Sequence, residues 1–309
     1  MASPRIEDLA ASFRRHLRAA GKAEGTLRLY GQSIRFFCDW LTERGRPTTL
    51  DELTRHAIAA WLADLAERVD IETVRTRLRG MRRFCRWLEA EGEVDTAPTA
   101  GVEMPKPTEK PVRVLTDDEL AALLKVCQVP RGRAGQFDRR IFDGRRDEVL
   151  LRLLADCGVR VSELAALTLD DVDQDRELVY VMGKGSRPRA VPYGARTGQA
   201  IDRYVRVRGA HRRAGATDRL LLGERGPMSP DGIRWRLEVL GQAAGVDGLH
   251  PHALRHTAAH RWLVAGGQER DLMHIMGWRS DSMLQVYARS TAVERAHLAH
   301  RRLGLGDRL

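Results

Sequence analysis

The sequence predicts a mainly α-helical protein with one small antiparallel β-sheet, divided into two domains. Apolar residues recur about every 3.6 positions through most of the 309 residues, which is the spacing of helices that bury one face. Two short runs rich in valine and tyrosine flank a glycine-rich segment and predict a β-hairpin. Pro105, Pro107 and Pro111 cluster between two helical regions, where they disfavour helix and indicate an extended linker. We therefore expect a helical domain over residues 1–100, a proline-rich linker over 101–113 and a second domain over 114–309.

The N-terminal domain is predicted to consist of helices. Apolar residues at helical spacing predict helices over residues 26–44, 50–67 and 71–91. Gly45 and Gly92 follow two of these runs, and a glycine just past the last apolar residue is typical of a helix end.

The helix predicted over residues 71–91 has two unlike faces. Its apolar side chains share one face: Val74, Leu78, Met81, Cys85 and Leu88. Its other side carries an arginine stripe, which we define as Arg75, Arg79, Arg82, Arg83 and Arg86. A solvated face usually mixes charge signs, yet no acidic residue lies between Thr73 and Leu88. The stripe therefore suits a DNA phosphate backbone or major groove, with a plain solvent-facing surface as the alternative.

The second domain is predicted to mix helices with a hairpin. Thr116 and Glu119 have the spacing of a capping box, which predicts a helix from there through Val126. The next stretch is expected to be a loop and is rich in arginine: Arg131, Arg133, Arg139, Arg140, Arg145 and Arg146. Helix is predicted again over residues 147–156, before Gly158. Strands are predicted over 178–182 and 189–193 around a turn at 183–188, and helices from about Gly194 to a last one over 292–303.

The charge of the chain favours polyanionic partners. Lysine and arginine total 52 against 42 acidic residues, which gives a net charge of +10. The lysines are Lys22, Lys106, Lys110, Lys125 and Lys184. The other cations are therefore arginines, whose planar guanidinium can fork onto phosphate. A GC-rich genome would give the same arginine excess without functional meaning, and this alternative stays open.

Composition also indicates where the protein works. No apolar stretch is long enough to cross a membrane, and the N-terminus lacks the apolar core of a signal peptide, so we expect a cytoplasmic protein without a membrane partner. The four cysteines are scattered without Cys-x-x-Cys spacing: Cys38, Cys85, Cys127 and Cys157. We expect buried reduced thiols rather than a disulfide or zinc framework.

Four short segments after the linker carry the candidate chemistry. They are Gly158-Val-Arg160-Val-Ser-Glu163-Leu, Gly183-Lys184-Gly185, His252-Ala-Leu-Arg255-His256, and Met276-Gly277-Trp278 with Tyr287 nine residues further on. In this order and spacing they resemble the tyrosine recombinase (phage integrase) family, whose pattern is Arg, Lys, His-x-x-Arg, His or Trp, and Tyr. The resemblance covers the region after the linker, while the N-terminal half is similar to the family only in size, helicity and charge. It implies a SAM-like helical core DNA-binding domain followed by an α+β catalytic domain with a C-terminal docking helix.

The resemblance implies a role for each matching residue. Arg160 and Arg255 match the two arginines that clamp the scissile phosphate, with Arg255 in the first turn of a helix that opens near Pro251. Tyr287 matches the nucleophile, whose phenolate forms a covalent 3′-phosphotyrosyl link and leaves a free 5′-hydroxyl. Lys184 matches the general acid that protonates the departing 5′-oxygen.

The remaining matches concern the surroundings of the phosphate. His252 matches the base or hydrogen-bond partner of the tyrosine, and His256 is expected to hydrogen-bond within the fold. Glu163 is expected to hold the active-site groups in position, with a solvent-exposed helix-start glutamate as the alternative. Trp278 stands where most members of the family have His. Its indole N–H can donate one hydrogen bond but cannot titrate, and its presence weakens a link to the Xer resolvases, which typically have His.

A metal site is not expected in this domain. His252, His256 and His260 follow one another at helical spacing, but no carboxylate accompanies them and the zinc-protease motif is missing. We therefore expect chemistry that needs neither a metal nor another cofactor.

The resemblance implies a site-specific DNA recombinase, an integrase or resolvase that cleaves and rejoins strands without ATP. Its implied partner is double-stranded DNA with an inverted-repeat core site, bound by a homotetramer on synapsed DNA, and the need for an accessory protein stays open. Three alternatives remain: a type IB topoisomerase-like nicking and religating enzyme, a catalytically inert DNA-binding regulator, and a metal-dependent nuclease. The residues do not distinguish integration from excision or resolution.

Overall fold

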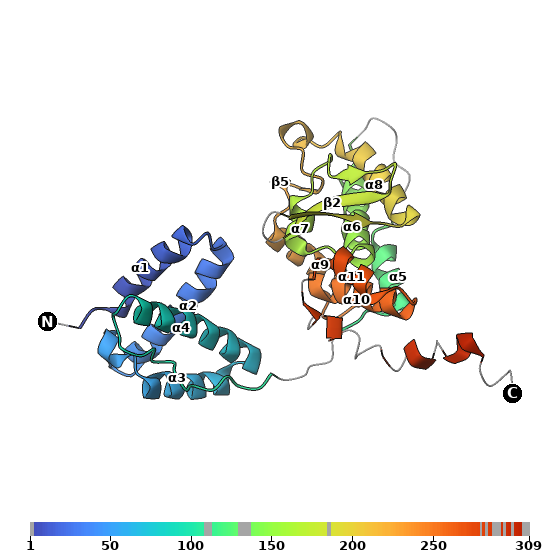
Figure 1. Ribbon diagram of the computed structural model, residues 1–309. Coiled ribbons are helices and arrows are strands. Elements are labelled where there is room, and N and C mark those ends of the chain that lie inside the picture. The colour runs from blue at the N-terminus through green and yellow to red at the C-terminus, as the bar shows by residue number, and fades with distance from the viewer. Residues whose placement is uncertain are drawn as a thin grey trace. The chain divides into compact units, whose positions relative to one another are not determined.

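The chain folds into two compact units, residues 1–110 and 111–309 (Figure 1). The computed structural model describes residues 3–107, 113–128, 137–183 and 187–278, and parts of the segment from 280 to 304. Among the described helices, none combines the length and the apolar character that a membrane span requires.

Unit 1 is helical. Its elements are α1 (Ile6–Ala19), α2 (Glu24–Glu43), the 3-10 turn η1 (Leu50–Glu52), α3 (Arg55–Arg68) and α4 (Ile71–Ala90). The three helices predicted from apolar spacing are present, and α1 is an addition to them. The helix predicted over 50–67 is interrupted at Leu53, because the Thr54 side chain caps a new helix by accepting from the Ala57 N–H at 3.1 Å.

Helix α4 shows why unit 1 is stable. The Asp70 side chain caps its N-terminus by accepting from the Glu72 N–H at 2.8 Å. Every apolar residue predicted for its inner face is buried: Val74, Leu78, Met81, Cys85 and Leu88. Phe37 and Leu41 of α2 belong to the same apolar cluster, to which α1 and α3 also contribute, so all four helices form the core of the unit.

Unit 2 contains a three-stranded antiparallel sheet in the order β1-β2-β3. Its elements before the second hairpin are α5 (Asp117–Val126), α6 (Arg139–Asp156), α7 (Val161–Ala166), β1 (Val172–Asp173), β2 (Leu178–Gly183), β3 (Arg187–Pro192) and α8 (Ala195–Arg208). They are followed by η2 (Ala214–Ala216), β4 (Leu222–Gly223), β5 (Gly226–Pro227), α9 (Pro230–Ala244), α10 (Pro251–Val264) and α11 (Glu269–Met276). The mainly helical fold with a small antiparallel sheet is confirmed.

The predicted capping box and hairpin are both present. Thr116 accepts from the Glu119 N–H at 3.1 Å, and the Glu119 carboxylate accepts from the Thr116 N–H at 2.9 Å. Strands β2 and β3 pair in a register that sets Val181 opposite Arg189. Opposite residues of an antiparallel pair point to the same face, and Val181 is buried. The Arg189 side chain therefore points inward.

Three sequence expectations for unit 2 were wrong. The predicted loop through Arg139, Arg140, Arg145 and Arg146 is instead the first half of α6, whereas Arg131 and Arg133 lie outside the described residues. The sheet gains the short strand β1, and the region after Gly194 contains the β4–β5 hairpin. These strands have two residues each, which is too short for an alternation of apolar and polar residues to appear.

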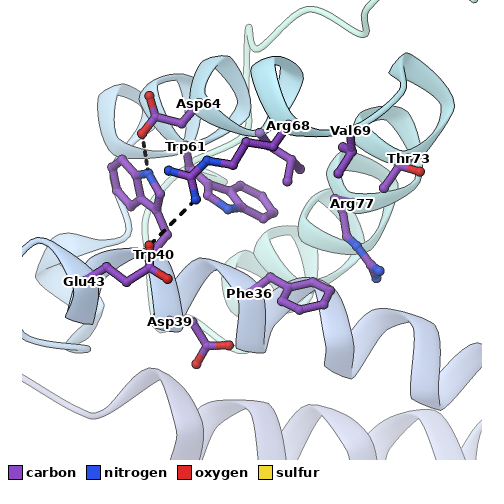
Figure 2. Close-up of a pocket in the computed structure, with 11 residues that line it drawn as sticks. Phe36, Asp39, Trp40, Glu43, Trp61, Asp64, Arg68, Val69, Thr73 and Arg77 are labelled. Carbon is purple, nitrogen blue, oxygen red and sulfur yellow. Dashed lines mark hydrogen bonds and ion pairs between the residues drawn. The ribbon is translucent and has the colours of Figure 1, made fainter.

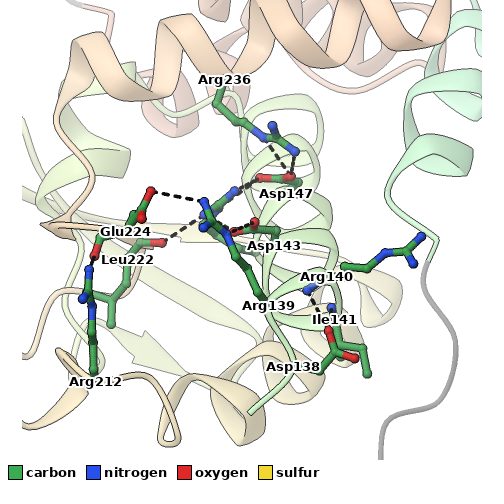
Figure 3. A network of polar contacts seen from close by, with 11 residues as sticks. Asp138, Arg139, Arg140, Ile141, Asp143, Asp147, Arg212, Leu222, Glu224 and Arg236 are labelled. Atoms are coloured by element: carbon green, nitrogen blue, oxygen red, sulfur yellow. Dashed lines mark hydrogen bonds and ion pairs between the residues drawn. The ribbon is translucent and has the colours of Figure 1, made fainter.

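A buried ionic network explains why the start of α6 does not look helical in sequence (Figure 3). Arg146 and Asp147 are only 6% and 1% exposed, so charged residues occupy core positions. Arg146 donates to the Asp147 carboxylate at 2.8 Å, and Arg236 of α9 donates to its other oxygen at 2.5 Å. Paired charges can replace apolar residues in a core, which breaks the apolar spacing that predicts a helix.

Candidate active site

The loop between α6 and α7 carries Arg160, the first predicted phosphate ligand. Its backbone N–H and its Nη1 donate to the two oxygens of Glu163, both at 2.8 Å. Its Nη2 lies 3.4 Å from the carbonyl oxygen of Gly277. The Arg160 side chain is 36% exposed, so a phosphate oxygen can approach it from solvent.

Glu163 is the anionic centre of the site and is 5% exposed. Arg189 of β3 grips it with two parallel hydrogen bonds, Nη1 to Oε1 and Nη2 to Oε2, each 2.8 Å. Burial raises the pKa of this carboxyl, but hydrogen bonds from Arg189 and Arg160 outweigh it, so the net pKa is lowered. Glu163 is thus ionised at neutral pH and holds Arg160. The alternative of a solvent-exposed glutamate is wrong.

Arg189 is a site residue that sequence reasoning missed. Its Nε donates to the carbonyl oxygen of Ile275 at 2.9 Å, near the end of α11. The one available signal was its position two residues before Val191 on the inward face of a strand, where a charge needs a partner.

Arg255, the second predicted phosphate ligand, is the fifth residue of α10 and therefore lies just past the first turn in which it was predicted. It is 5% exposed and donates to the carbonyl oxygens of Gly158 and Met276. Its guanidinium carbon lies 5.9 Å from the ring centre of Trp278, which is itself buried. The structure therefore brings Arg160, Arg255, Glu163 and Trp278 together.

Two of the carbonyls that hold the arginines belong to glycines in the left-handed backbone conformation. Gly158 accepts from Arg255, and Gly277 accepts from Arg160. Gly158 has φ of +59° and Gly277 has φ of +62°, a region where residues with a Cβ are strained. A Cβ on Gly158 would lie 2.8 Å from Met276 Sδ and closer still to its Cε. A Cβ on Gly277 would lie 3.2 Å from the Arg189 guanidinium carbon. Both glycines therefore allow the close approach of the segments that hold the arginines.

A row of histidines lies beside Arg255 on α10. His252 is exposed, and its ring centre is 6.3 Å from that of His256 and 6.5 Å from that of His250. Partial burial and the neighbouring charges of His250 and Arg255 lower the pKa of His252. Burial, His252 and His250 lower the pKa of His256 to about 4. These imidazoles are neutral at pH 7 and can accept a proton or a hydrogen bond.

Two of the predicted catalytic residues lie outside the described residues. They are Lys184, between β2 and β3, and Tyr287, beyond Trp278. The described ends of the β2–β3 hairpin pair Gly183 with Arg187. Within the described part of the chain, His, Cys, Asp and Glu side chains form no group of three that could hold a metal ion.

The arginine stripe of α4 divides into two groups. Arg75 donates to the carbonyl of Pro105 and Arg82 to that of Val102, so both fasten the following segment of the chain. The other three stripe residues are exposed: Arg79, Arg83 and Arg86. These three are the members available to a phosphate.

Unit 1 also has a groove of about 400 Å³ between α2, α3 and α4 (Figure 2). Its lining includes Trp40 and Trp61 together with acidic side chains and two arginines, Arg68 and Arg77. Trp40 Nε1 donates to the Asp64 carboxylate at 2.7 Å, and Arg77 stacks on Phe36 at 4.5 Å from the ring centre.

Both units of the chain match known protein families. The sequence pattern of the phage integrase family matches residues 113–294, and that of the phage integrase N-terminal SAM-like domain matches residues 9–92. The chain belongs to the phage integrase family. The resemblance inferred from the four segments is thereby confirmed.

Relatives of this integrase-family chain cover nearly its whole length. A tyrosine recombinase XerC of Corynebacterium efficiens is 31% identical over 269 residues, which cover 86% of this chain and 81% of the relative. A tyrosine recombinase XerC of Mycobacterium tuberculosis is 32% identical over 287 residues, covering 91% and 93%. The chain is thus similar over most of its length to proteins named XerC, a link that Trp278 was expected to weaken.

Solved integrases share the fold. The integrase of transposon Tn1549, solved in complex with transposon right end DNA, superposes with a TM-score of 0.72 at 19% identity, over 97% of this chain and 99% of that one. A lambda integrase dimer bound to a core site gives a TM-score of 0.70 at 18% identity, over 92% and 77%.

Proposed function

We propose that this protein is a tyrosine-type site-specific DNA recombinase, which breaks and rejoins duplex DNA through a covalent 3′-phosphotyrosine at Tyr287. One observation carries the proposal. Arg160 donates to the carbonyl of Gly277 and Arg255 to that of Met276, so both cations are held by the one segment that leads to Trp278, and Arg255 also donates to the carbonyl of Gly158. Two fixed cations beside an ionised Glu163 and neutral histidines form a site for a phosphodiester. The names of the relatives also support this function.

The two arginines stabilise the charge that grows on the phosphate. In the transition state the non-bridging oxygens gain negative charge, and guanidinium groups already oriented by protein carbonyls need no reorganisation. Arg160 presents its partly exposed guanidinium, and Arg255 contributes a buried cation close to Trp278. The Trp278 indole donates without titrating, so its role is to position rather than to shuttle protons.

Proton transfer accompanies each strand cleavage. The Tyr287 oxygen forms a bond to phosphorus while the bond from phosphorus to the 5′-oxygen breaks. His252, neutral because its pKa is lowered, accepts the tyrosine proton, and Lys184 supplies a proton to the 5′-oxygen. Rejoining reverses these steps, so the bond energy kept in the phosphotyrosine makes ATP unnecessary.

The DNA partner and the assembly complete the proposal. Residues 1–100 act as the core DNA-binding domain, with the exposed arginines of the stripe on the phosphate backbone, and residues 114–309 act as the catalytic domain. A homotetramer synapses two inverted-repeat core sites in the cytoplasm, and a helix over 292–303 docks on a neighbouring protomer. The net charge of +10 supports a polyanionic partner.

The test uses plasmids that carry two copies of the DNA flanking the gene. Incubation in excess EDTA should give two circles or an inverted segment, together with protein covalently bound to a 3′-phosphate. Relaxation of any supercoiled plasmid without exchange would indicate a topoisomerase, and binding without cleavage a regulator. Cleavage that requires a divalent ion would indicate a nuclease, and each of these three outcomes would overturn the proposal.

A further inference from the structure

Arg189 lies where three segments of the active site meet. It is on β3, it pairs with Glu163 at the start of α7, and it donates to Ile275 near the end of α11. We propose that Arg189 is a positioning residue for the DNA cleavage step, which orients Arg160 through the Glu163 carboxylate. This inference rests on the proposed recombinase function, since it concerns the rate of the same reaction.

Arg189 fixes the geometry of the Glu163 carboxylate. Two parallel hydrogen bonds from one guanidinium fix both the place and the plane of the Glu163 carboxylate. The same two oxygens receive the Nη1 and the backbone N–H of Arg160. The plane set by Arg189 therefore determines the direction in which Arg160 presents its guanidinium.

Burial explains why this link is rigid. The side chain of Glu163 is 4% exposed and that of Arg189 14%, whereas the side chain of Arg160 is 36% exposed. A buried carboxylate must keep its hydrogen bonds, because losing one leaves a charge unpaired away from water. The rigid Arg189–Glu163 pair thus forms the base, and Arg160 is the member of the chain that reaches the phosphate.

A second anchor ties the same guanidinium to the other side of the site. The carbonyl of Gly277, which receives Arg160 Nη2, belongs to the residue whose missing side chain makes room for Arg189. Arg189 therefore contacts both groups that hold Arg160, which are the Glu163 carboxylate and the segment around Gly277. A lysine in this place could neutralise Glu163 but could not form the planar pair and reach Ile275 at once.

Arg189 also lies on the strand that follows Lys184, so a competing role through the proton donor has to be separated by experiment. A DNA substrate with sulfur in place of the bridging 5′-oxygen provides this separation. A thiolate leaves without protonation, so cleavage of that substrate does not need the general acid. A variant with a defective phosphate clamp stays slow on the sulfur substrate. A variant with a defective proton donor cleaves the sulfur substrate at the normal rate.

The experiment measures the rate of covalent adduct formation on a nicked cognate site with oxygen or sulfur at that position. Arg189→Gln should slow cleavage about 10- to 100-fold on both substrates, since small misplacements of catalytic groups have effects of this size. DNA affinity should stay within about threefold, because the change moves a positioning group rather than the binding surface. Arg189→Lys should recover only part of the rate. Arg176→Met replaces an exposed arginine of the same unit. This variant is the matched control and should cleave at the normal rate.

A double variant keeps the test decisive if Arg189→Gln folds poorly. Arg189→Met with Glu163→Gln removes both charges of the buried pair, which is far less costly than leaving one unpaired. It should cleave no more slowly than Glu163→Gln alone, because both residues act through the same chain of contacts.

Three results would overturn the inference. Arg189→Gln could cleave the oxygen substrate at the normal rate, or it could recover the full rate on the sulfur substrate. The double variant could cleave more slowly than Glu163→Gln alone, by the product of the two single defects. An unaltered protein that forms no adduct would instead contradict the proposed function.

Discussion

Gly158→Ala is the substitution whose cost follows most directly from the structure. A left-handed backbone at φ +59° costs a residue with a Cβ about 1–2 kcal/mol. The new methyl would also lie 3.3 Å from the Ala258 Cβ and 2.8 Å from Met276 Sδ. Met276 is 2% exposed and cannot swing into solvent, so this overpacking adds about 1–3 kcal/mol. We expect a loss of unfolding free energy of about 2–5 kcal/mol in total.

Gly245→Ala is the matched control in the same unit. Gly245 has φ of +68°, and a Cβ there would meet nothing within 4 Å, so the control carries the backbone strain alone. Urea unfolding of both variants gives the difference due to crowding. In a protein that already carries Met276→Ala, the crowding is removed. Gly158→Ala should then lower the unfolding free energy only as much as Gly245→Ala does. Equal losses in the two single variants would refute the crowding argument.

The other predictions concern pH, DNA binding and a helix cap. Since the pKa of His256 falls to about 4 in the folded protein, chiefly through burial, the unfolded state binds its proton first as the pH drops below about 6.5. Stability should therefore decline between about pH 6.5 and 4, by about 1–2 kcal/mol after allowing for solvent screening, and the His256→Gln variant should lack this part of the decline in urea titrations. Alanine at the three exposed stripe positions, Arg79, Arg83 and Arg86, should weaken DNA binding about tenfold or more and flatten its salt dependence, while Arg82→Met should affect stability instead; unchanged affinity would leave the stripe facing solvent. Thr116→Ala should cost about 1 kcal/mol in thermal or urea unfolding by removing the capping box, and no loss would contradict the observed cap.

The sequence predicted those elements whose signals are local. Helix α4 follows from the spacing of Val74, Leu78 and Met81, and α5 from the Thr116 capping box, because both depend on residues within a few turns of one another. The start of α6 could not be found in this way. Its core position at Arg146 is charged, and the Asp147 carboxylate that makes this tolerable is held in place by Arg236 of α9.

The candidate site was predictable to the extent that it follows a motif. Arg160, Arg255 and Trp278 were found from their order along the chain, and the structure brings them together. Arg189 was missed because its role depends on Glu163 and on a carbonyl of α11, contacts that no local pattern records. Arg82 belongs to the stripe by spacing, yet its contact with the Val102 carbonyl exists only in the folded unit.

The proposed mechanism requires Tyr287 to form a covalent bond to DNA. The most direct measurement mixes the unaltered protein and Tyr287→Phe with a nicked cognate site in excess EDTA, and separates covalent adducts by denaturing electrophoresis. We expect an adduct that protease reduces to a 3′-phosphotyrosyl peptide for the unaltered protein, and none for Tyr287→Phe, with DNA affinity within about threefold since only one hydroxyl is lost. An adduct that persists in Tyr287→Phe, or strand cleavage that requires a divalent ion, would contradict the account.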